Sequence, residues 1–376
     1  MTQAFIQPLD VLVLRGNHLF GAAGSYGAAQ MPPWPSVFAG ALRSHLLAAG
    51  GHDPQAFGRG GIEHPELGTP ERPGPFTLAG VQLARRGKEG RIERLFPLPA
   101  DAVVLTDKDE TRTVHGLQPR APMLPSGWTL PLMPVLKAPQ GKPDSGWLLD
   151  EAGWQLWLQG ETVERAHLVK TSDLWRMESR PGVGLDANRR AAEDGKLFTV
   201  QAVAMRPEAG FVVQVQGCTG PLPPGMLRLG GDGRAARLLT DLPESELPPL
   251  PRVEPRALLD AGRLRILLTS PGLFADGWKL PGVDAEGRFS LHGVKGRLAS
   301  AAVARAETVS GWDLARRAPK PARRVAPTGS VYWIDQLEAT PEALDKLVET
   351  GLWLDADENP SRRAEGFNRI VLGAWR

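Results

Sequence analysis

Short runs of apolar residues, separated by glycine and proline, recur along the chain and predict a fold rich in strands. The run at 11–14 is continuously apolar and ends at Arg15, a pattern typical of a strand buried on both faces. A turn at 207–210 separates two further runs, which together predict a hairpin. The remaining predicted strands and the two arms of this hairpin lie at 76–83, 102–105, 198–205, 211–216, 264–269, 330–335 and 370–372.

Helical periodicity is confined to a few segments. In the first, Ser36 is the expected N-cap of an apolar stripe over 37–46, and Gly50 ends the helix. A short helix is predicted at 150–159. In the last, Thr340 caps a helix that has Pro341 at its first position and that closes at Gly351. The segment 226–229 gives only a weak helix signal.

One eight-residue motif occurs twice, at 184–191 (GLDANRRA) and at 311–318 (GWDLARRA). Both copies read glycine, a large apolar residue, aspartate, two variable positions and Arg-Arg-Ala. Each copy leads into a strand-like run, so we interpret the pair as the mark of a duplicated domain. We expect the aspartate of each copy to anchor the loop that presents the two arginines.

Composition limits the function classes. The 376 residues predict two or three domains, and a net charge of +2 gives no global basic field, so any nucleic-acid site must come from local clusters. The single cysteine, Cys218, excludes an intrachain disulfide and a cysteine-rich metal site. No apolar run approaches the roughly 18 residues of a membrane span. We expect a soluble, cytoplasmic protein without a cofactor.

Glycine and basic residues do gather locally, and they recur in the same order in each half: strand, glycine-rich loop, repeated motif, strand or hairpin, basic glycine loop, closing strand. This order predicts an α+β protein with two ferredoxin-like (βαββαβ) domains. We place the domains at 1–245 and 256–376, separated by a proline-rich stretch. The first carries an insertion at about 52–183, whose part at 115–147 has too many prolines for continuous sheet or helix.

Several segments resemble the RAMP superfamily, and within it the third subunit of the type III-B CRISPR Cmr effector complex. The resemblance is carried by 8–17 (PLDVLVLRGN), Phe20-Gly21, 32–36 (PPWPS) and 39–43 (AGALR), by the spaced positions Glu178, Arg180, Gly182, Gly184 and Asp186, and by Gly311-Trp312-Asp313, Pro319-Lys320-Pro321 and Glu365-Gly366-Phe367. It implies two RRM-like domains and a subunit that binds guide RNA by its 5′ repeat-derived tag. The implied protein partners are the large polymerase/cyclase-like subunit and the RAMP backbone subunit.

Candidate RNA-binding residues combine that resemblance with the basic clusters, where glycine lets backbone approach phosphate and arginine supplies charge. Ion pairing or simple solvation of the arginines is the alternative interpretation of the same pattern. The candidates are Arg15, Gly16, Asn17, His18, Arg43, Arg180, Arg189, Arg190, Arg234, Arg316, Arg317, Lys320, Arg323, Arg324, Arg362, Arg363 and Arg369.

Catalysis has little support in the sequence. None of the seven histidines has metal-ligand spacing such as HExxH. His18 in the first glycine-rich loop is the one candidate acid or base, because some RAMP relatives cleave RNA without metal. The prediction is therefore a non-catalytic subunit, with a metal-independent RAMP ribonuclease and a generic RRM-type RNA binder as alternatives.

Overall fold

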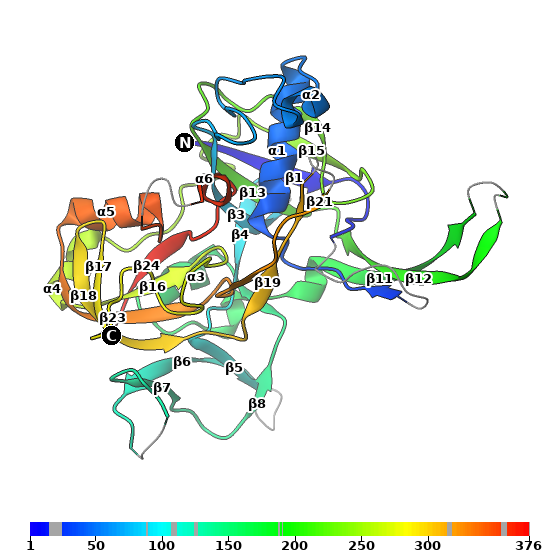
Figure 1. Cartoon of the computed structure of the whole chain (residues 1–376). Coiled ribbons are helices and arrows are strands. Elements are labelled where there is room, and N and C mark those ends of the chain that lie inside the picture. Colours follow the sequence, from blue (N-terminus) through cyan, green and yellow to red (C-terminus); the bar gives the residue numbers. More distant parts are fainter. Residues whose placement is uncertain are drawn as a thin grey trace. The chain divides into compact units, whose positions relative to one another are not determined.

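The computed structural model describes residues 1–14, 25–87, 89–106, 111–123, 127–186, 189, 191–313, 318–354 and 359–375. The chain forms two compact, discontinuous units, in both of which strands predominate over helices (Figure 1). Unit 1 comprises Met1–Ile92, Ser172–Glu246 and Thr308–Arg323, and unit 2 comprises Glu93–Thr171, Leu247–Glu307 and Arg324–Arg376. No helix among the described residues is long and apolar enough to cross a membrane.

Unit 1 is built on antiparallel strands in the order β3-β13-β1-β15-β14, covered by helix α1. The apolar stripe of α1 is buried as predicted, and Phe38 packs edge-on against Phe211 of the sheet at 4.9 Å between ring centres. A second sheet has the order β11-β12-β2. The elements are β1 Thr2–Pro8, β2 Ser25–Gly27, α1 Pro35–Ala49, α2 Pro54–Gly58, β3 Thr77–Arg86, β11 Trp175–Leu185, β12 Ala192–Met205, β13 Ala209–Gln216, β14 Gly225–Arg228, β15 Ala235–Leu239, β20 Trp312–Asp313 and β21 Ala318–Pro319.

Four predictions in unit 1 were wrong. The run at 11–14 is buried but is not a strand: it follows β1 and makes a two-way backbone bridge between Leu12 and Val203. The runs at 198–205 and 211–216 are strands but not a hairpin, because β12 pairs with β11 and β2 whereas β13 pairs with β1 and β3. The weak helix at 226–229 is strand β14. Ser36 is not the N-cap of the first helix, because α1 begins at Pro35 and has Trp34 at its N-cap.

Unit 2 has a central sheet in the order β17-β18-β23-β16-β24 with apolar cores on both faces. Along β16, Ile266 and Leu268 belong to one core and Leu267 to the other, which explains why this strand reads as an uninterrupted apolar run. Helix α5 covers one face through Leu344 and Leu347. The elements are α4 Pro255–Ala261, β16 Leu264–Leu268, β17 Arg288–Leu291, β18 Val294–Ala302, β23 Val331–Glu338, α5 Pro341–Thr350, α6 Pro360–Ala364 and β24 Ile370–Ala374, with the short pair β19 Glu307–Val309 and β22 Arg323–Val325 at the ends of the segment that belongs to unit 1.

Residues 93–171, which we expected inside the first domain, cluster with unit 2. Helix α3 sends Trp154 and Trp157 into the core that also holds Trp333, so burial of these aromatic side chains fixes the segment to unit 2. The segment also contains the sheet β7-β6-β5-β8, contrary to the prediction of no continuous sheet. Its elements are β4 Ile92–Pro97, β5 Ala102–Thr106, β6 Arg112–Arg120, β7 Met133–Leu136, β8 Lys142–Asp144, β9 Trp147–Leu149, α3 Glu151–Leu158, β10 Leu168–Lys170 and two short 3₁₀ turns, Arg165–His167 and Thr171–Asp173.

Candidate nucleic-acid interface

The first copy of the repeated motif forms the turn that joins β11 to β12. Leu185 pairs with Ala192, and the Asp186 backbone N–H donates to the Ala191 carbonyl at 2.9 Å. The Arg189 backbone N–H donates to Asp186 Oδ1 at 3.1 Å. The aspartate therefore holds the turn that carries the arginine, as we expected, and it does so through the backbone. Ala187, Asn188 and Arg190 lie outside the described residues.

The second copy is a hairpin turn with the same register. Trp312 of β20 pairs with Pro319 of β21, and Asp313 pairs with Ala318. These pairs correspond one to one with Leu185 and Ala192 and with Asp186 and Ala191, so both copies place four residues between the aspartate and the alanine. Arg316 and Arg317 lie outside the part of the chain that the structure describes.

The large apolar residue of each copy lies on the surface. The exposed fraction is 62% for Leu185 and 57% for Trp312. Exposed large apolar side chains often mark an interaction site, and here both lie next to a turn whose sequence contains arginine. Neither position was among the predicted site residues, although the repetition of a large apolar residue is visible in the motif.

The first basic glycine loop, 230–234, packs against the segment that follows β1. The Gly231 backbone N–H donates to the Val13 carbonyl at 2.8 Å. Gly230 has φ 78°, and a Cβ added there would lie 2.8 Å from the Val13 oxygen, so only glycine fits without displacing that carbonyl. The close approach fixes the loop, and with it the position of Arg234.

Arg234 is held at the surface by an ion pair. Its Nη1 lies 2.6 Å from Asp10 Oδ2, while Asp10 Oδ1 accepts from the Val11 backbone N–H at 2.7 Å. The Val11 N–H and the Arg234 guanidinium lower the pKa of Asp10, and the charge of Arg180 acts in the same direction. Arg234 and Arg180 thus contribute to one electrostatic neighbourhood around Asp10.

Arg180 lies exposed on β11, in a sheet row with Val200 of β12 and Gly27 of β2. Its guanidinium is 3.1 Å from Glu178, which also pairs with Arg176 at 2.9 Å, and the two arginines lower the pKa of that carboxyl, Arg180 most. The segments on either side of the predicted first glycine-rich loop meet here, because the Gln30 backbone N–H donates to the Leu14 carbonyl at 2.8 Å. Its own candidates Arg15, Gly16, Asn17 and His18 lie outside the described residues.

The second basic glycine loop differs from the prediction. Arg362 and Arg369 are only 7% and 6% exposed, so they lie inside unit 2 and not on a surface that RNA could reach. Arg362 pairs with buried Glu365 at 3.0 Å and lies over the Phe367 ring. Arg369 donates to the Glu349 carbonyl, and burial lowers its pKa to about 10. Both cations are part of the internal structure of the segment that joins α5 to β24.

The remaining described candidates lie on or next to four different elements. Arg43 on α1 is half-buried, with its guanidinium 5.6 Å from the centre of the Phe76 ring. Arg323 and Arg324 are exposed on β22, whereas Lys320 is half-buried after β21 and Arg363 is half-buried in α6. Within the described part of the chain, no group of three or more His, Cys, Asp or Glu side chains could hold a metal ion.

One family model matches nearly the whole chain. The profile of the family described as CRISPR-associated protein (Cas_Cmr3) matches residues 4–375. No curated protein matches the sequence.

Two solved structures share the fold. One is a chain of the cryo-EM structure of type III-B Cmr-beta bound to cognate target RNA and AMPPnP, state 1, with 15% identity, a TM-score of 0.52 and coverage of 98% of this chain and 95% of that one. The other is a chain of Cmr-beta bound to cognate target RNA, with 14% identity, a TM-score of 0.53 and coverage of 98% and 96%. Since the family profile spans nearly the whole sequence, the chain belongs to the Cmr3 family of CRISPR-associated proteins.

Proposed function

We propose that this protein is a non-catalytic, guide-RNA-binding subunit of a type III-B CRISPR complex, and that it holds the 5′ repeat-derived tag of the guide. Its protein partners would be the large polymerase/cyclase-like subunit and the RAMP backbone subunit. The observation that carries the proposal is the pair of matching hairpin turns, each with an aspartate, two arginines and an exposed apolar side chain.

The chemistry of these turns suits single-stranded RNA. Arginine attracts phosphate, and an exposed leucine or tryptophan offers an apolar or aromatic face to an unstacked base. The anchored Arg189 backbone limits the conformational entropy that binding would otherwise cost. Charge supports the second hairpin in particular, since 311–324 contains five cations and one acid.

We further propose that the two units are diverged copies of one ferredoxin-like RAMP domain. In unit 1, the first strand of the chain lies between β13 and β15, and β3 lies beyond β13. In unit 2, β16 lies between β23 and β24, and β18 lies beyond β23. The strands therefore follow the same order relative to the chain, which is the support for duplication.

A charge reversal tests the RNA site. Arg189→Glu with Arg190→Glu should weaken binding of tag-bearing guide RNA at least tenfold, and should make the slope of log affinity against log salt shallower by about 0.7 for each phosphate that the variant no longer neutralises. Arg59→Glu with Arg72→Glu, which reverses two exposed arginines elsewhere in unit 1, is the matched control. Equal affinities for the two double variants would remove the first hairpin from the site.

The non-catalytic part of the proposal has its own test. Purified protein incubated with repeat RNA in EDTA should leave the RNA intact. Sequence-specific cuts that disappear in His18→Ala would replace the scaffold role by a metal-independent ribonuclease. A pull-down from cells that encode the complex should recover the two partner subunits, and RNA bound without them would instead favour a generic RNA binder.

A further inference from the structure

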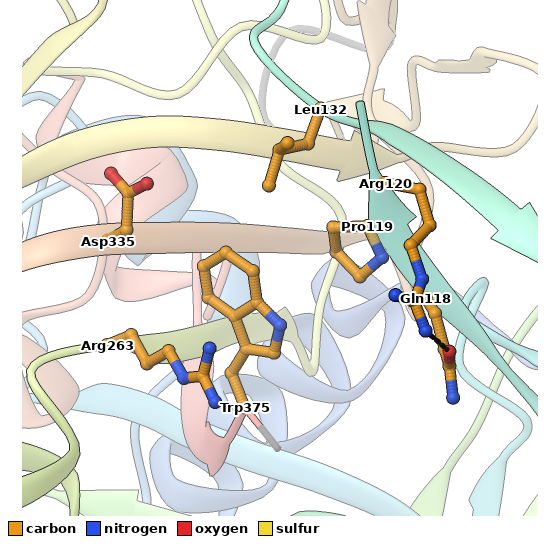
Figure 2. A pocket seen from close by; sticks show the side chains of 7 residues that line it. All are labelled: Gln118, Pro119, Arg120, Leu132, Arg263, Asp335 and Trp375. Atoms are coloured by element: carbon orange, nitrogen blue, oxygen red, sulfur yellow. Dashed lines mark hydrogen bonds between the residues drawn. The ribbon is translucent and has the colours of Figure 1, made fainter. Parts of the chain in front are cut away.

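A groove at one end of the unit 2 sheet is lined by Gln118, Pro119, Arg120, Leu132, Arg263, Asp335 and Trp375 (Figure 2). Leu264 pairs with Ile334 on β23 and with Ala374 on β24. One position further along each of these two ladders, Arg263 lies opposite Asp335 on one side and opposite Trp375 on the other. The three residues therefore form one row across the sheet. Because directly opposed residues of antiparallel strands share a face, this row forms the floor of the groove.

The wall comes from the 93–171 segment. Gln118, Pro119 and Arg120 are on β6, and Leu132 precedes β7. The Leu132 backbone N–H donates to the Ala299 carbonyl of β18 at 2.8 Å, which fixes the wall to the central sheet. The groove is open to solvent on one side and has a volume of about 500 Å³, within the roughly 300–1,000 Å³ of small-molecule sites.

The groove carries positive charge. Asp335 accepts from Arg297 Nε at 2.9 Å and from Nη2 at 2.6 Å, so its carboxylate is already neutralised by a bidentate partner outside the groove. Arg120 donates to Gln118 Oε1 at 2.6 Å, and the Arg263 guanidinium lies 5.3 Å from the centre of the Trp375 ring. Among the described residues neither of these two arginines has a carboxylate partner, which leaves two cations for a ligand.

Aromatic and apolar surface lies between those cations. Figure 2 shows the Trp375 indole in the middle of the groove, with Arg263 on one side and Pro119 and Arg120 on the other. An indole and a guanidinium plane are the groups on which nucleobases stack. Gln118 adds an amide that can both donate to and accept from a base edge.

We propose that this groove binds a nucleoside phosphate, with the base against Trp375 and Arg263 and the phosphate on Arg120. The two guanidinium groups supply charge-assisted hydrogen bonds, and the tryptophan ring supplies stacking area. The site lies wholly within unit 2, and none of its residues belongs to the hairpins or to the basic glycine loops. The nucleoside phosphate can be a free nucleotide or one unit of a strand, since both present the same base and phosphate.

The test uses the full chain, with AMP and the trinucleotide ApApA lacking a terminal phosphate as separate probes in titration calorimetry. Arg120→Ala and Arg263→Ala should each weaken binding at least tenfold, whereas Arg305→Ala, an exposed arginine elsewhere in unit 2, should change it less than twofold. AMP binding alone assigns the groove to a free nucleotide or strand end, and trinucleotide binding that needs the same arginines assigns it to a strand.

Three outcomes overturn the proposal. One is that neither probe binds at millimolar concentration. Another is binding that survives both arginine substitutions. The last is that AMP and ApApA fail while a hexaglutamate peptide binds through Arg120 and Arg263, which would assign the groove to an acidic peptide. Because both probes are too short to carry a tag, these outcomes are independent of whether the hairpins bind guide RNA.

Discussion

The two units arrange their strands in the same order, yet each keeps a different helix. Unit 1 has helix α1 after β1 and strand β14 before β15, whereas unit 2 has an irregular loop after β16 and helix α5 before β24. The strand order fixes every backbone ladder of a sheet, whereas different helices can bury the same face of that sheet. In unit 2 the second face is covered by α3 and its tryptophans.

The basic glycine loops show the same contrast on a smaller scale. The first precedes β15, the second precedes β24, and both contain glycine and arginine. In unit 1, Arg234 of the first loop forms an ion pair with the exposed Asp10. In unit 2, Arg362 and Arg369 of the second loop are buried. Similar local sequences therefore present an arginine near the surface in one unit and bury arginines inside the other, depending on how each loop packs.

The largest expected effect comes from the buried loop. Arg362→Ala removes the cation beside the buried Glu365 carboxylate, so we expect the free energy of unfolding to fall by about 3–5 kcal/mol in urea denaturation. Adding Glu365→Ala should recover part of this loss. The neighbouring Arg363→Ala, at a half-buried position, should cost much less, and equal losses for Arg362 and Arg363 would contradict the contrast between the loops.

Glycine substitutions test the exposed loop. Gly233→Ala places alanine at φ 65° in open space and should cost about 1–2 kcal/mol. Gly230→Ala must in addition displace the Val13 carbonyl, so its loss of stability should be clearly larger. Thermal unfolding of both variants gives the difference, and an equal loss would show that the approach to Val13 does not constrain the loop.

The two helices differ at their N-termini. Thr340 Oγ1 accepts from the Ala343 backbone N–H at 3.2 Å, so Thr340→Ala should lower stability by about 1 kcal/mol. Ser36 makes no such bond, because α1 has Trp34 at its N-cap without a side-chain cap. Ser36→Ala should therefore leave the unfolding midpoint nearly unchanged, and a loss equal to that of Thr340→Ala would contradict this assignment.

The smallest effect concerns the surface ion pair of Arg234. The pKa of Asp10 is lowered from 3.8 in the folded state, so its contribution is present above that value and is lost as pH falls through the folded pKa. Asp10→Asn should cost less than about 1 kcal/mol near neutral pH. The difference between Asp10→Asn and the native protein should vanish in acid, and a difference that persists there would exclude the ion pair as its source.

Much of the fold could be predicted from local pattern. The apolar stripe of α1, the capped helix α5, the helix α3 and the strands β3, β16, β23 and β24 all appear where periodicity and turn residues predicted them. Each carries its own signal, since a buried face leaves a period and a cap leaves a threonine or a glycine. Two of the failures are the strand at 11–14 and the hairpin at 198–216, where burial was correctly predicted and the pairing partner was not.

Less of the candidate site could be predicted. The repeated motif was visible in sequence, but its identical hairpin register and its exposed Leu185 and Trp312 came only from the structure. The groove of Arg120, Arg263 and Trp375 had no sequence signal, because its members are brought together by strands distant in the chain. Likewise nothing in 361–369 distinguished buried cations from surface cations.

The sequence alone determined the local elements, the repeated eight-residue motif and the kinship with one CRISPR-associated family, because each of these is recorded in nearby residues. Only the tertiary structure decided which strands pair, which unit holds residues 93–171, and which arginines meet solvent. Those outcomes depend on contacts between residues far apart in the chain: Trp154 with the core around Trp333, and Arg369 with the Glu349 carbonyl of α5. The repeated motif shows both contributions. The sequence repeats its residues, and the fold gives the two copies the same strand-pairing register.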